Sequence, residues 1–287
     1  MTAIETKSLT KYYGKNRGIM DVSISVNEGE IYGFIGPNGA GKSTTIKTLL
    51  NFIYPTKGSA KVLGLDCATE SHRIKAQTGY VPSEIRYYED LTVQELLDYA
   101  ARFHKGSADT GEWISRFELE PKKKVGALSS GNKKKVALAA ALQSSPKLLI
   151  LDEPTNGLDP LMRQTLFTAL REQQAKGCTV FLSSHNLDEV QTLCDRVAII
   201  REGKIVDVRT IREMAATQGK KVTVFGGKLP DKKSEAVNIV SETPESVVFT
   251  WRSNDMRGLL ALLSAMDAKD LLVEDEKLSD IFMSYYN

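Results

Sequence analysis

The chain has 287 residues, of which 41% are hydrophobic and 26% are charged. This is enough apolar material for one large domain with a sizeable core and a smaller second domain. The 38 basic and 36 acidic residues leave a formal net charge of +2, so the composition gives no indication of a nucleic-acid-binding face.

Cysteine usage and hydrophobicity indicate the compartment. Cys67, Cys178 and Cys194 are scattered and include no CxxC pair, which favours reduced cytosolic thiols over a disulfide framework. The first residues lack the apolar core of a signal peptide, and no apolar run approaches the roughly 18 residues of a membrane-spanning helix. We therefore expect any membrane role to depend on another subunit.

The first 215 residues alternate between apolar strand patterns and helical patterns. Met20 to Val26 alternates like a half-buried strand. The later apolar runs are short and follow at loop–helix spacing, as expected of buried parallel strands. The predicted strands are Met20–Val26, Glu30–Ile35, Gly58–Leu63, Thr78–Pro82, Lys147–Leu151, Thr179–Ser183 and Arg196–Ile200. The predicted helices are Lys42–Phe52, Thr92–Phe103, Thr110–Phe117, Ser130–Leu142, Leu161–Ala175 and Leu187–Leu193.

Beyond about Met214 the pattern changes. Three short segments predict antiparallel strands, two predict helices, and Thr217-Gln218-Gly219 is the expected joint. We therefore expect a large α/β domain at residues 1–215 and a small α+β domain at residues 216–287. The predicted elements of the small domain are Lys220–Phe225, Ala236–Ile239, Ser246–Trp251, Met256–Met266 and Leu278–Tyr286.

Residues 36–43 read Gly-Pro-Asn-Gly-Ala-Gly-Lys-Ser and match the phosphate-loop pattern GxxxxGK[ST]. The glycines let backbone N–H groups turn around phosphates, and the following helix points its positive end at them. Lys42 can bridge the β and γ phosphates, and the Ser43 hydroxyl suits Mg²⁺. The loop predicts nucleotide binding; the alternative is a glycine-rich structural turn.

An apolar strand at Leu148–Leu151 delivers two acids, Asp152 and Glu153, at its carboxyl end, where open α/β sheets bind ligands. We expect Asp152 to hold Mg²⁺. Because adjacent residues on a strand point apart, Glu153 can face an attacking water as the general base. The alternative is an acidic turn before Pro154.

Taken together, six segments resemble the ATP-binding subunit of bacterial ABC transporters of the exporter type linked to drug and antibiotic resistance. The resemblance covers roughly residues 1–215 and rests on the order and spacing of residues 9–14, 36–43, 128–132, 152–153, 156–159 and 183–185. It implies a P-loop NTPase core with antiparallel β and α-helical subdomains, followed by a small C-terminal α+β domain.

The resemblance also implies roles for residues around ATP. Tyr13 would stack on adenine, with Tyr12 as the alternative. The implied catalytic residues are Glu153, His185 and Lys42, with His185 at the γ phosphate. The implied ATP-binding residues are Tyr13, Gly36, Pro37, Asn38, Gly39, Ala40, Gly41, Lys42, Ser43 and Thr44.

A second subunit is implied by the turn at Leu128–Asn132, which reads LSSGN where the family has LSGGQ. In the family this turn faces the phosphate loop of the second subunit, and two ATP molecules lie between two chains. A Ser/Gly turn that opens a helix offers N–H groups to an anion, although alone it equally suits a helix cap. The implied partner-chain ATP contacts are Ser129, Ser130, Gly131, Asn132 and Asp159.

Several positions depart from the family pattern. Ser130 and Asn132 are variants that we expect to be tolerated, and Lys134 and Lys135 stand where Gln and Arg are usual. Ser83 replaces a glutamine that reaches the metal and the attacking water, and a serine is too short for that contact. We expect slower or less tightly coupled hydrolysis, with Ser83 acting through a water or Glu84 moving in. The implied metal ligands are Ser43 and Asp152, with Ser83 or Glu84 as a further candidate.

The resemblance implies ATP and Mg²⁺ as cofactors, an integral-membrane permease as partner, and no nucleic acid. The subunit would work as a homodimer or heterodimer at the cytoplasmic face of the membrane. Export is expected because the tail, residues 278–286, resembles the closing segment of bacterial exporter-type ABC ATPases. In this segment Leu278, Ile281, Phe282 and Tyr285 form one helical face. That face packs either on the domain's own strands or in a partner groove.

Two other functions are alternatives. A soluble ABC ATPase acting on ribosomes or DNA would carry two cassettes or a long coiled-coil insertion, and this chain has neither. A binding switch with weak hydrolysis is the third hypothesis, and Ser83 motivates it.

Overall fold

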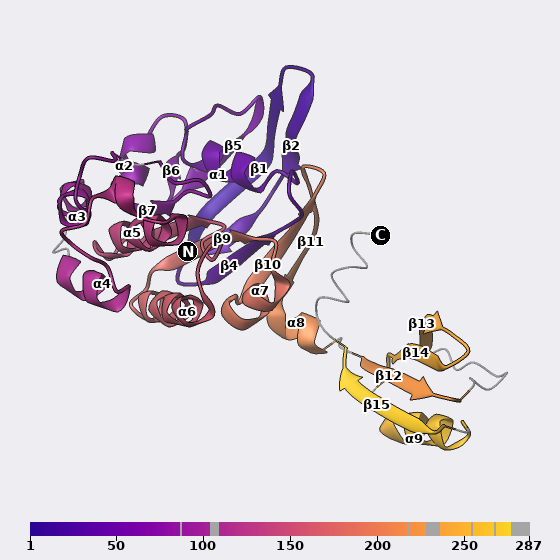
Figure 1. Ribbon diagram of the computed structural model, residues 1–287. Helices are drawn as coiled ribbons and strands as arrows, with labels where there is room; N and C mark the ends of the chain where they lie inside the picture. Colours follow the sequence, from indigo (N-terminus) through magenta and orange to yellow (C-terminus); the bar gives the residue numbers. More distant parts are fainter. Residues whose placement is uncertain are drawn as a thin grey trace. The chain divides into compact units, whose positions relative to one another are not determined.

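The computed structural model describes residues 1–86, 88–103, 109–216, 219–227, 236–253, 255–266 and 268–276. The chain divides into two compact units, Met1–Thr210 and Ile211–Asn287, so the division lies a few residues before the expected boundary at residue 215 (Figure 1). The predicted tail helix at Leu278–Tyr286 and the joint residues Thr217 and Gln218 lie outside the described residues.

A six-stranded sheet forms the centre of the first unit, in the order β11-β10-β4-β9-β8-β7. The five strands from β10 to β7 are parallel, which confirms the predicted buried parallel strands, and β11 is antiparallel to β10. The strands are β4 (Ile31–Ile35), β7 (Thr78–Val81), β8 (Leu148–Asp152), β9 (Thr179–Ser184), β10 (Arg196–Arg201) and β11 (Lys204–Thr210). The carboxyl ends of the five parallel strands meet at one edge of the sheet, which brings the loops that follow them together.

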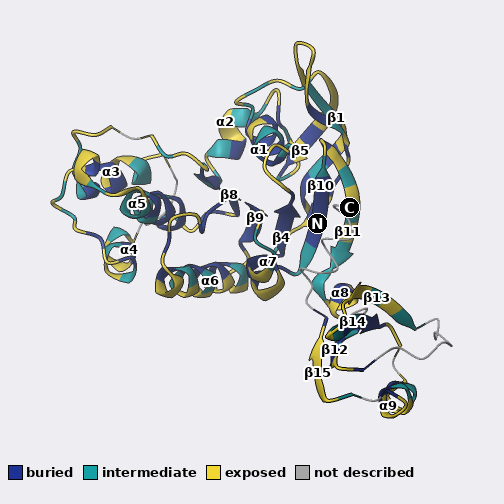
Figure 2. Ribbon diagram, turned by 45° about the vertical axis from the view of Figure 1, so that its right-hand side comes forward, coloured by how far each residue is buried: buried dark blue, intermediate teal, exposed yellow. Residues whose placement is uncertain are grey.

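Helices cover this sheet. The helix α1 contacts β8, α5 contacts β7, and α6 and α7 contact β9. Figure 2 shows the strands between these helices as buried, and β4, β8 and β9 are buried along their whole length. The helices are α1 (Lys42–Leu49), α5 (Ser130–Leu142), α6 (Pro160–Ala175) and α7 (Leu187–Leu193). Together they leave the carboxyl edge of the sheet open for the loops that form the site.

An antiparallel sheet packs beside the parallel one. Its strand order is β2-β1-β5-β6, and β3 also pairs with β1. The strands are β1 (Thr2–Tyr13), β2 (Asn16–Val22), β3 (Ser25–Asn27), β5 (Lys57–Val62) and β6 (Leu65–Asp66). Apolar residues of this sheet share one core with α1 and with one face of the parallel sheet.

The prediction of one strand at Met20–Val26 is wrong, because Ser23 and Ile24 interrupt it and separate β2 from β3. The expected alternation remains, since Val22, Ile24 and Val26 are all buried. The buried Thr6 hydroxyl donates to the Val22 carbonyl at 2.8 Å and accepts from the Ile24 N–H at 2.9 Å. A side chain of β1 therefore replaces ladder hydrogen bonds at the break, which no local pattern reveals.

Three further helices and a short 3₁₀ turn complete the first unit. They are α2 (Ser71–Lys75), α3 (Val93–Ala101), α4 (Thr110–Arg116) and the turn Val125–Ala127. Thr92 caps α3 in a reciprocal pair with Glu95, which is the sequence signature of a helix start. Both α3 and α4 contact α5, so the helix that follows Ser129 belongs to this helical layer.

The second unit is a small α+β fold around a four-stranded antiparallel sheet, in the order β13-β14-β12-β15, and the predicted antiparallel strands are confirmed. Val222, Val224 and Phe249 pack against Leu259 and Leu263 of α9. The elements are α8 (Ile211–Ala216), β12 (Lys220–Phe225), β13 (Val237–Glu242), β14 (Ser246–Trp251), α9 (Met256–Ser264) and β15 (Asp270–Asp275). The edge strand β15 was not predicted, because its apolar residues are consecutive rather than alternating.

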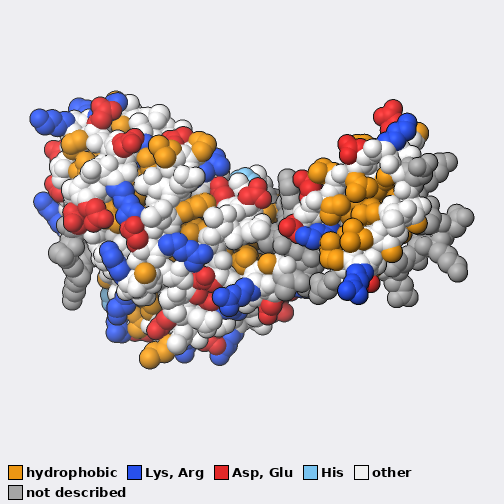
Figure 3. All heavy atoms as spheres, turned by 90° about the horizontal axis from the view of Figure 1, so that it is seen from below, with side chains coloured by type: hydrophobic (Ala, Val, Ile, Leu, Met, Phe, Trp, Pro, Cys, Tyr) orange, Lys and Arg blue, Asp and Glu red, His pale blue; other side chains and the backbone are white. Residues whose placement is uncertain are grey.

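Apolar side chains are also gathered on one surface of this unit (Figure 3). The exposed large apolar residues of its elements are Phe225, Val240, Met256, Leu260, Leu271, Leu272 and Val273. Among the residues described, none of the helices combines the length and apolarity needed to cross a bilayer. Cys67, Cys178 and Cys194 are buried free thiols, and burial raises the pKa of each.

Candidate functional site

A cavity of about 470 Å³ opens at the carboxyl edge of the parallel sheet. Loops that follow β4, β7, β8 and β9 contribute to its wall, together with the end of β1 and the start of β2. The residues that line it are Tyr13, Arg17, Gly18, Pro37, Asn38, Gly39, Gly41, Lys42, Ser43, Thr44, Ser83, Glu84, Glu153, Asn156 and His185. Residues as far apart in the chain as Tyr13 and His185 are thus brought together.

The phosphate loop forms the floor of this cavity between β4 and α1. Gly41 precedes the first residue of α1 with φ at 112°, a conformation that only glycine adopts readily. A Cβ at Gly36 would lie 2.3 Å from the backbone oxygen of Ile200, so this position also requires glycine. Gly36 and Ala40 do not line the cavity, although both were predicted ATP-binding residues, and Ala40 packs into the core instead.

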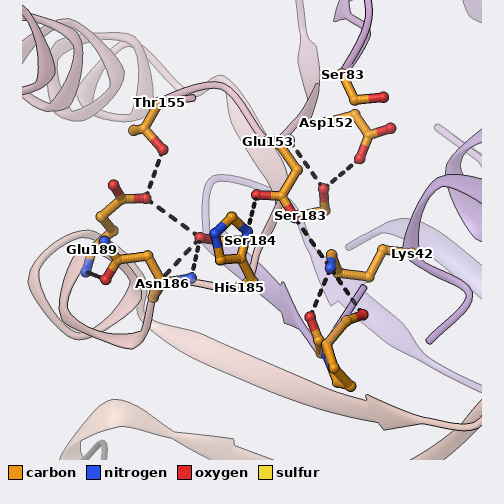
Figure 4. A network of polar contacts seen from close by, with 12 residues as sticks. Lys42, Ser83, Asp152, Glu153, Thr155, Ser183, Ser184, His185, Asn186 and Glu189 are labelled. Atoms are coloured by element: carbon orange, nitrogen blue, oxygen red, sulfur yellow. Dashed lines mark hydrogen bonds and ion pairs between the residues drawn. The ribbon is translucent and has the colours of Figure 1, made fainter. Parts of the chain in front are cut away.

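Three predicted catalytic residues form one network (Figure 4). The Lys42 ammonium donates to the carbonyl oxygens of Gly36 at 2.6 Å and Pro37 at 3.3 Å. It also forms an ion pair with Glu153 Oε1 at 3.1 Å, although the two groups are not aligned for a hydrogen bond. The other oxygen, Oε2, is 2.7 Å from Nδ1 of His185. The carboxylate is therefore held between a cation and an imidazole.

The backbone of Glu153, rather than strand alternation, directs its side chain. The strand β8 ends at Asp152, and Glu153 adopts a left-handed conformation with φ at 51°, which is uncommon for a residue with a Cβ. Its N–H donates to both the carbonyl and the hydroxyl oxygen of Ser183, at 3.2 and 3.1 Å. Glu153 therefore does not belong to the strand, and the alternation of side chains along a strand does not explain its direction.

The residues present would fit a magnesium ion that takes only a few of its ligands from the protein. Asp152 is buried at the end of β8, and Ser183 donates a 2.6 Å hydrogen bond to its Oδ1. Ser43 lines the cavity next to Lys42. These are hard oxygen ligands, and Mg²⁺ typically takes only one or two carboxylates from the protein. Among the described residues there is no cluster of three side chains able to hold a metal alone.

The departure at Ser83 lies in the wall of the same cavity. Ser83 and Glu84 both line it, and both are exposed. The Glu84 carboxylate is 3.7 Å from Arg86 with a side chain that is 84% exposed, so it points toward solvent. Of the two alternatives for a further metal contact, Ser83 needs a bridging water and Glu84 needs a movement of the loop.

Of the two tyrosines predicted as candidates for adenine stacking, Tyr13 lines the cavity and Tyr12 does not. Tyr13 lines the cavity at the end of β1 and is 46% exposed, and the Lys11 ammonium lies 5.5 Å from its ring centre. Arg17 and Gly18 line the same region and were not predicted. They lie at the start of β2, directly after the short turn from β1, and no sequence motif includes them.

The residues predicted to contact the partner's ATP do not line the cavity. They lie on two turns that touch each other, since a Cβ at Gly131 would lie 2.6 Å from the Gly157 carbonyl oxygen. Ser129 caps α5 by accepting from the Asn132 N–H at 3.3 Å, and Asp159 caps α6 by accepting from Met162 N–H at 2.9 Å. Ser129, Ser130 and Asp159 are exposed.

A buried carboxylate that the sequence did not reveal supports both regions. Glu189 on α7 accepts from the Thr155 hydroxyl at 2.7 Å and from the Ser184 hydroxyl at 3.3 Å, as Figure 4 shows. Arg163 on α6 lies 3.6 Å from its other oxygen. Glu189 therefore ties the turn after Glu153 to the residue before His185. An isolated glutamate on a short helix carries no sequence signal for this role.

Comparisons with known proteins agree with this geometry. Residues 19–156 match the family model described as ABC transporter. The chain is 41% identical over 214 residues to the bacitracin transport ATP-binding protein BcrA of Bacillus licheniformis, covering 72% of this chain and 69% of that protein. It is 36% identical over 208 residues to the Nod factor export ATP-binding protein I of Burkholderia orbicola, covering 70% of this chain and 68% of that protein.

A solved structure of an ATP-binding subunit of an ABC transporter superposes with a TM-score of 0.70 at 33% identity, covering 75% of this chain and 92% of the other. The fold, the phosphate loop and these relatives lead to one assignment. The chain belongs to the ABC transporter family, as an ATP-binding and ATP-hydrolysing subunit that energises transport.

Proposed function

We propose that this subunit energises export through a separate membrane permease, and that each ATP is hydrolysed between two ATP-binding chains. The observation that carries the proposal is the Lys42–Glu153–His185 network inside the phosphate-loop cavity. Glu153 is already oriented by a cation and an imidazole, which is the arrangement that a general base beside a γ phosphate requires.

In the proposed reaction, ATP binds with its base on Tyr13 and its phosphates on the loop from Gly36 to Thr44. Glu153 takes a proton from water as the water oxygen attacks the γ phosphorus and the bond to ADP breaks. Lys42 and His185 stabilise the charge on the transferred phosphoryl oxygens. Ser43 and Asp152 would hold Mg²⁺, which supplies neutralisation of phosphate charge when bound.

The two exposed turns support the two-chain arrangement. Ser129, Ser130, Gly131, Asn132 and Asp159 surround the contact between Gly131 and Gly157 and lie outside the chain's own cavity. Their caps use one side-chain oxygen each and leave other N–H groups of the helix starts available to an anion. We propose that they complete the cavity of a second chain, which for the purified protein is another copy.

A second cavity, of about 450 Å³, supports a permease partner. It is lined by Phe52, Tyr80 and Phe103, together with Leu50, Lys75, Thr78, Gly79, Ala100, Ala140 and Ala141. Phe52 is 51% and Phe103 is 61% exposed, and exposed apolar surface of this kind marks protein interaction sites. We propose that the permease docks here and holds the subunit at the cytoplasmic face of the membrane.

The direction of transport and the role of the second unit are part of the same proposal. Two relatives are named for bacitracin transport and for Nod factor export, which supports export. None of the residues that line the nucleotide cavity comes from the unit that begins at Ile211. We therefore propose an accessory or regulatory role for residues 216–287.

Glu153→Gln tests this function. The variant keeps the shape of the side chain but cannot accept the proton, so we expect ATP binding to remain and turnover to fall by about 10²–10⁴-fold. Glu120→Gln, at an exposed glutamate paired with Lys123, is the matched control. Near-normal hydrolysis by purified Glu153→Gln would remove Glu153 as the base.

A further inference from the structure

Lys134 occupies an unusual position for a lysine. It lies in the first half of α5 and is only 3% exposed. Its ammonium donates to the backbone carbonyl oxygens of Pro82 at 3.0 Å and Ser83 at 3.3 Å. These are adjacent carbonyls in the loop that follows β7, and the loop forms a wall of the nucleotide cavity.

No carboxylate of a described residue lies within ion-pair distance of the Lys134 ammonium, whereas its neighbour Lys133 lies 3.5 Å from Glu89. Burying an ammonium group without a counter-ion is unfavourable. Burial accordingly lowers the pKa of Lys134, and the more distant carboxylates of Asp152 and Glu153 oppose this change. The hydrogen bonds to Pro82 and Ser83 are therefore the interactions that the buried ammonium makes with the described residues.

The two ends of Lys134 belong to different nucleotide sites. Its backbone lies in α5, two residues after Asn132 at the end of the Ser129–Asn132 turn. This turn serves the partner's ATP in the proposed dimer. Its ammonium holds Pro82 and Ser83, which belong to the chain's own cavity. A movement of α5 against the sheet must therefore either carry the loop with it or break both hydrogen bonds.

We propose that Lys134 is a positioning residue that couples the two nucleotide sites of the dimer, by tying the Ser83 wall of one site to the helix that bears the signature turn of the other. The inference rests on the proposed two-chain function. In this coupling the loop is held by its backbone, so a short side chain at position 83 suffices.

The chemistry of lysine fits this task. An ammonium group has three donors on a flexible stem and can serve two adjacent carbonyls at once. A glutamine at the same position would have a shorter reach and only two donors on one amide. The long side chain of Lys134 therefore links α5 to the cavity wall through backbone carbonyls, and this link does not need a long side chain at Ser83.

The test uses the purified full-length chain and three variants. Lys134→Met keeps the apolar stem and removes the donors, Lys134→Arg keeps a cation with several donors, and Lys133→Met is the control on the same helix. We measure kcat, the Hill coefficient for ATP, the affinity for ATP and the melting temperature. The last two quantities detect damage to folding or to the chain's own binding surface.

We expect Lys134→Met to lower kcat by about tenfold, since a small misplacement of a catalytic wall has large effects. Its Hill coefficient should fall toward 1, while ATP affinity changes by less than about twofold. Lys134→Arg should recover most of the cooperativity, and Lys133→Met should resemble the wild type. These expectations separate a positioning role from a structural one, which would change affinity and melting temperature instead.

Two results overturn the inference. One is a Lys134→Met variant with the kcat and Hill coefficient of the wild type, and the other is a variant whose losses follow its melting temperature alone. A wild-type chain that neither hydrolyses ATP nor dimerises in the presence of ATP would contradict the proposed function itself. The proposed coupling between the two sites would then also be wrong. The wild-type measurement therefore distinguishes the two failures.

Discussion

The nucleotide cavity and the pair of exposed turns at Ser129 and Asp159 use polar groups in opposite ways. In the cavity, the buried Lys42 forms an ion pair with Glu153 and donates to the Gly36 and Pro37 carbonyls. On the turns, Ser129 and Asp159 bond only to the starts of their own helices and remain exposed. The cavity is thus preorganised within one chain, whereas the role proposed for the turns requires a second chain.

This difference gives distinct expectations for variants in the two regions. Changes in the cavity should reduce catalysis in every chain that carries them. Changes on the turns should leave the binding of ATP to a separate chain intact and reduce only the turnover that needs two chains.

His185→Ala removes the imidazole that contacts Glu153 Oε2 at 2.7 Å. We expect turnover to fall by about 10²-fold, because a preorganised donor near developing charge is typically worth this much. ATP affinity should change little, since His185 is one of many residues around the cavity. Single-turnover hydrolysis checks the effect, and a loss confined to ATP affinity would contradict it.

Gly131→Ala tests the exposed turns. The new Cβ would lie 2.6 Å from the Gly157 carbonyl oxygen, so one of the two turns must move. We expect about a tenfold loss of turnover, by the same sensitivity to misplacement, with unchanged ATP affinity of the separate chain. Gly111→Ala in α4 is the control, because its Cβ would meet only Asp109, at 3.9 Å. Equal losses of affinity and turnover in Gly131→Ala would remove the distinction between the regions.

Glu189→Ala tests the connection behind both regions. It leaves the buried Thr155 hydroxyl without its 2.7 Å acceptor, which costs about 1–3 kcal/mol of the free energy of unfolding. Turnover should fall several-fold, because Thr155 follows Glu153 closely. Denaturant unfolding and steady-state hydrolysis measure the two effects, and Glu172→Ala on the surface of α6 is a suitable comparison. Unchanged stability would mean that Glu189 has no supporting role.

Asp159→Asn should have the smallest effect and depends on pH. The hydrogen bond from the Met162 N–H lowers the pKa of Asp159, with a further contribution from Lys135. Because the pKa of Asp159 is lower in the folded state, its carboxylate stabilises the protein at pH values above the ordinary pKa of 3.8. This stabilisation is lost as the pH falls through the lowered pKa of the folded state. Asparagine also caps helices, so melting curves of the two proteins should agree near pH 7 and differ in their response to acid. An identical acid response would show that this carboxylate does not contribute.

Much of the fold could be predicted because the parallel strands are short, apolar and regularly spaced, and because the phosphate loop has a local pattern. Features that depend on distant partners could not. The break at Ser23–Ile24 is stabilised by Thr6, and the direction of Glu153 depends on Ser183 across the sheet. The exposed strand β15 forms because β12 offers a free edge.

The site followed the same rule. Residues within a contiguous motif, such as Lys42 and Ser43, could be identified from the sequence and lie in one cavity. Glu189 and Lys134 could not, since each acts through hydrogen bonds to loops more than 30 residues away. In the sequence, Lys134 differs from the family pattern, and in the structure its ammonium contacts the Ser83 loop.

The central claim is that the exposed turns of one chain serve the ATP of another. Mixing two impaired variants tests it most directly. In a mixed dimer of Glu153→Gln and Gly131→Ala, the intact cavity of the second chain meets the intact turn of the first, and one of the two sites is whole. Equal mixing should therefore restore up to about one quarter of wild-type turnover, as expected for random pairing in a symmetric dimer. A mixture that hydrolyses ATP no faster than the two variants measured separately would contradict the account.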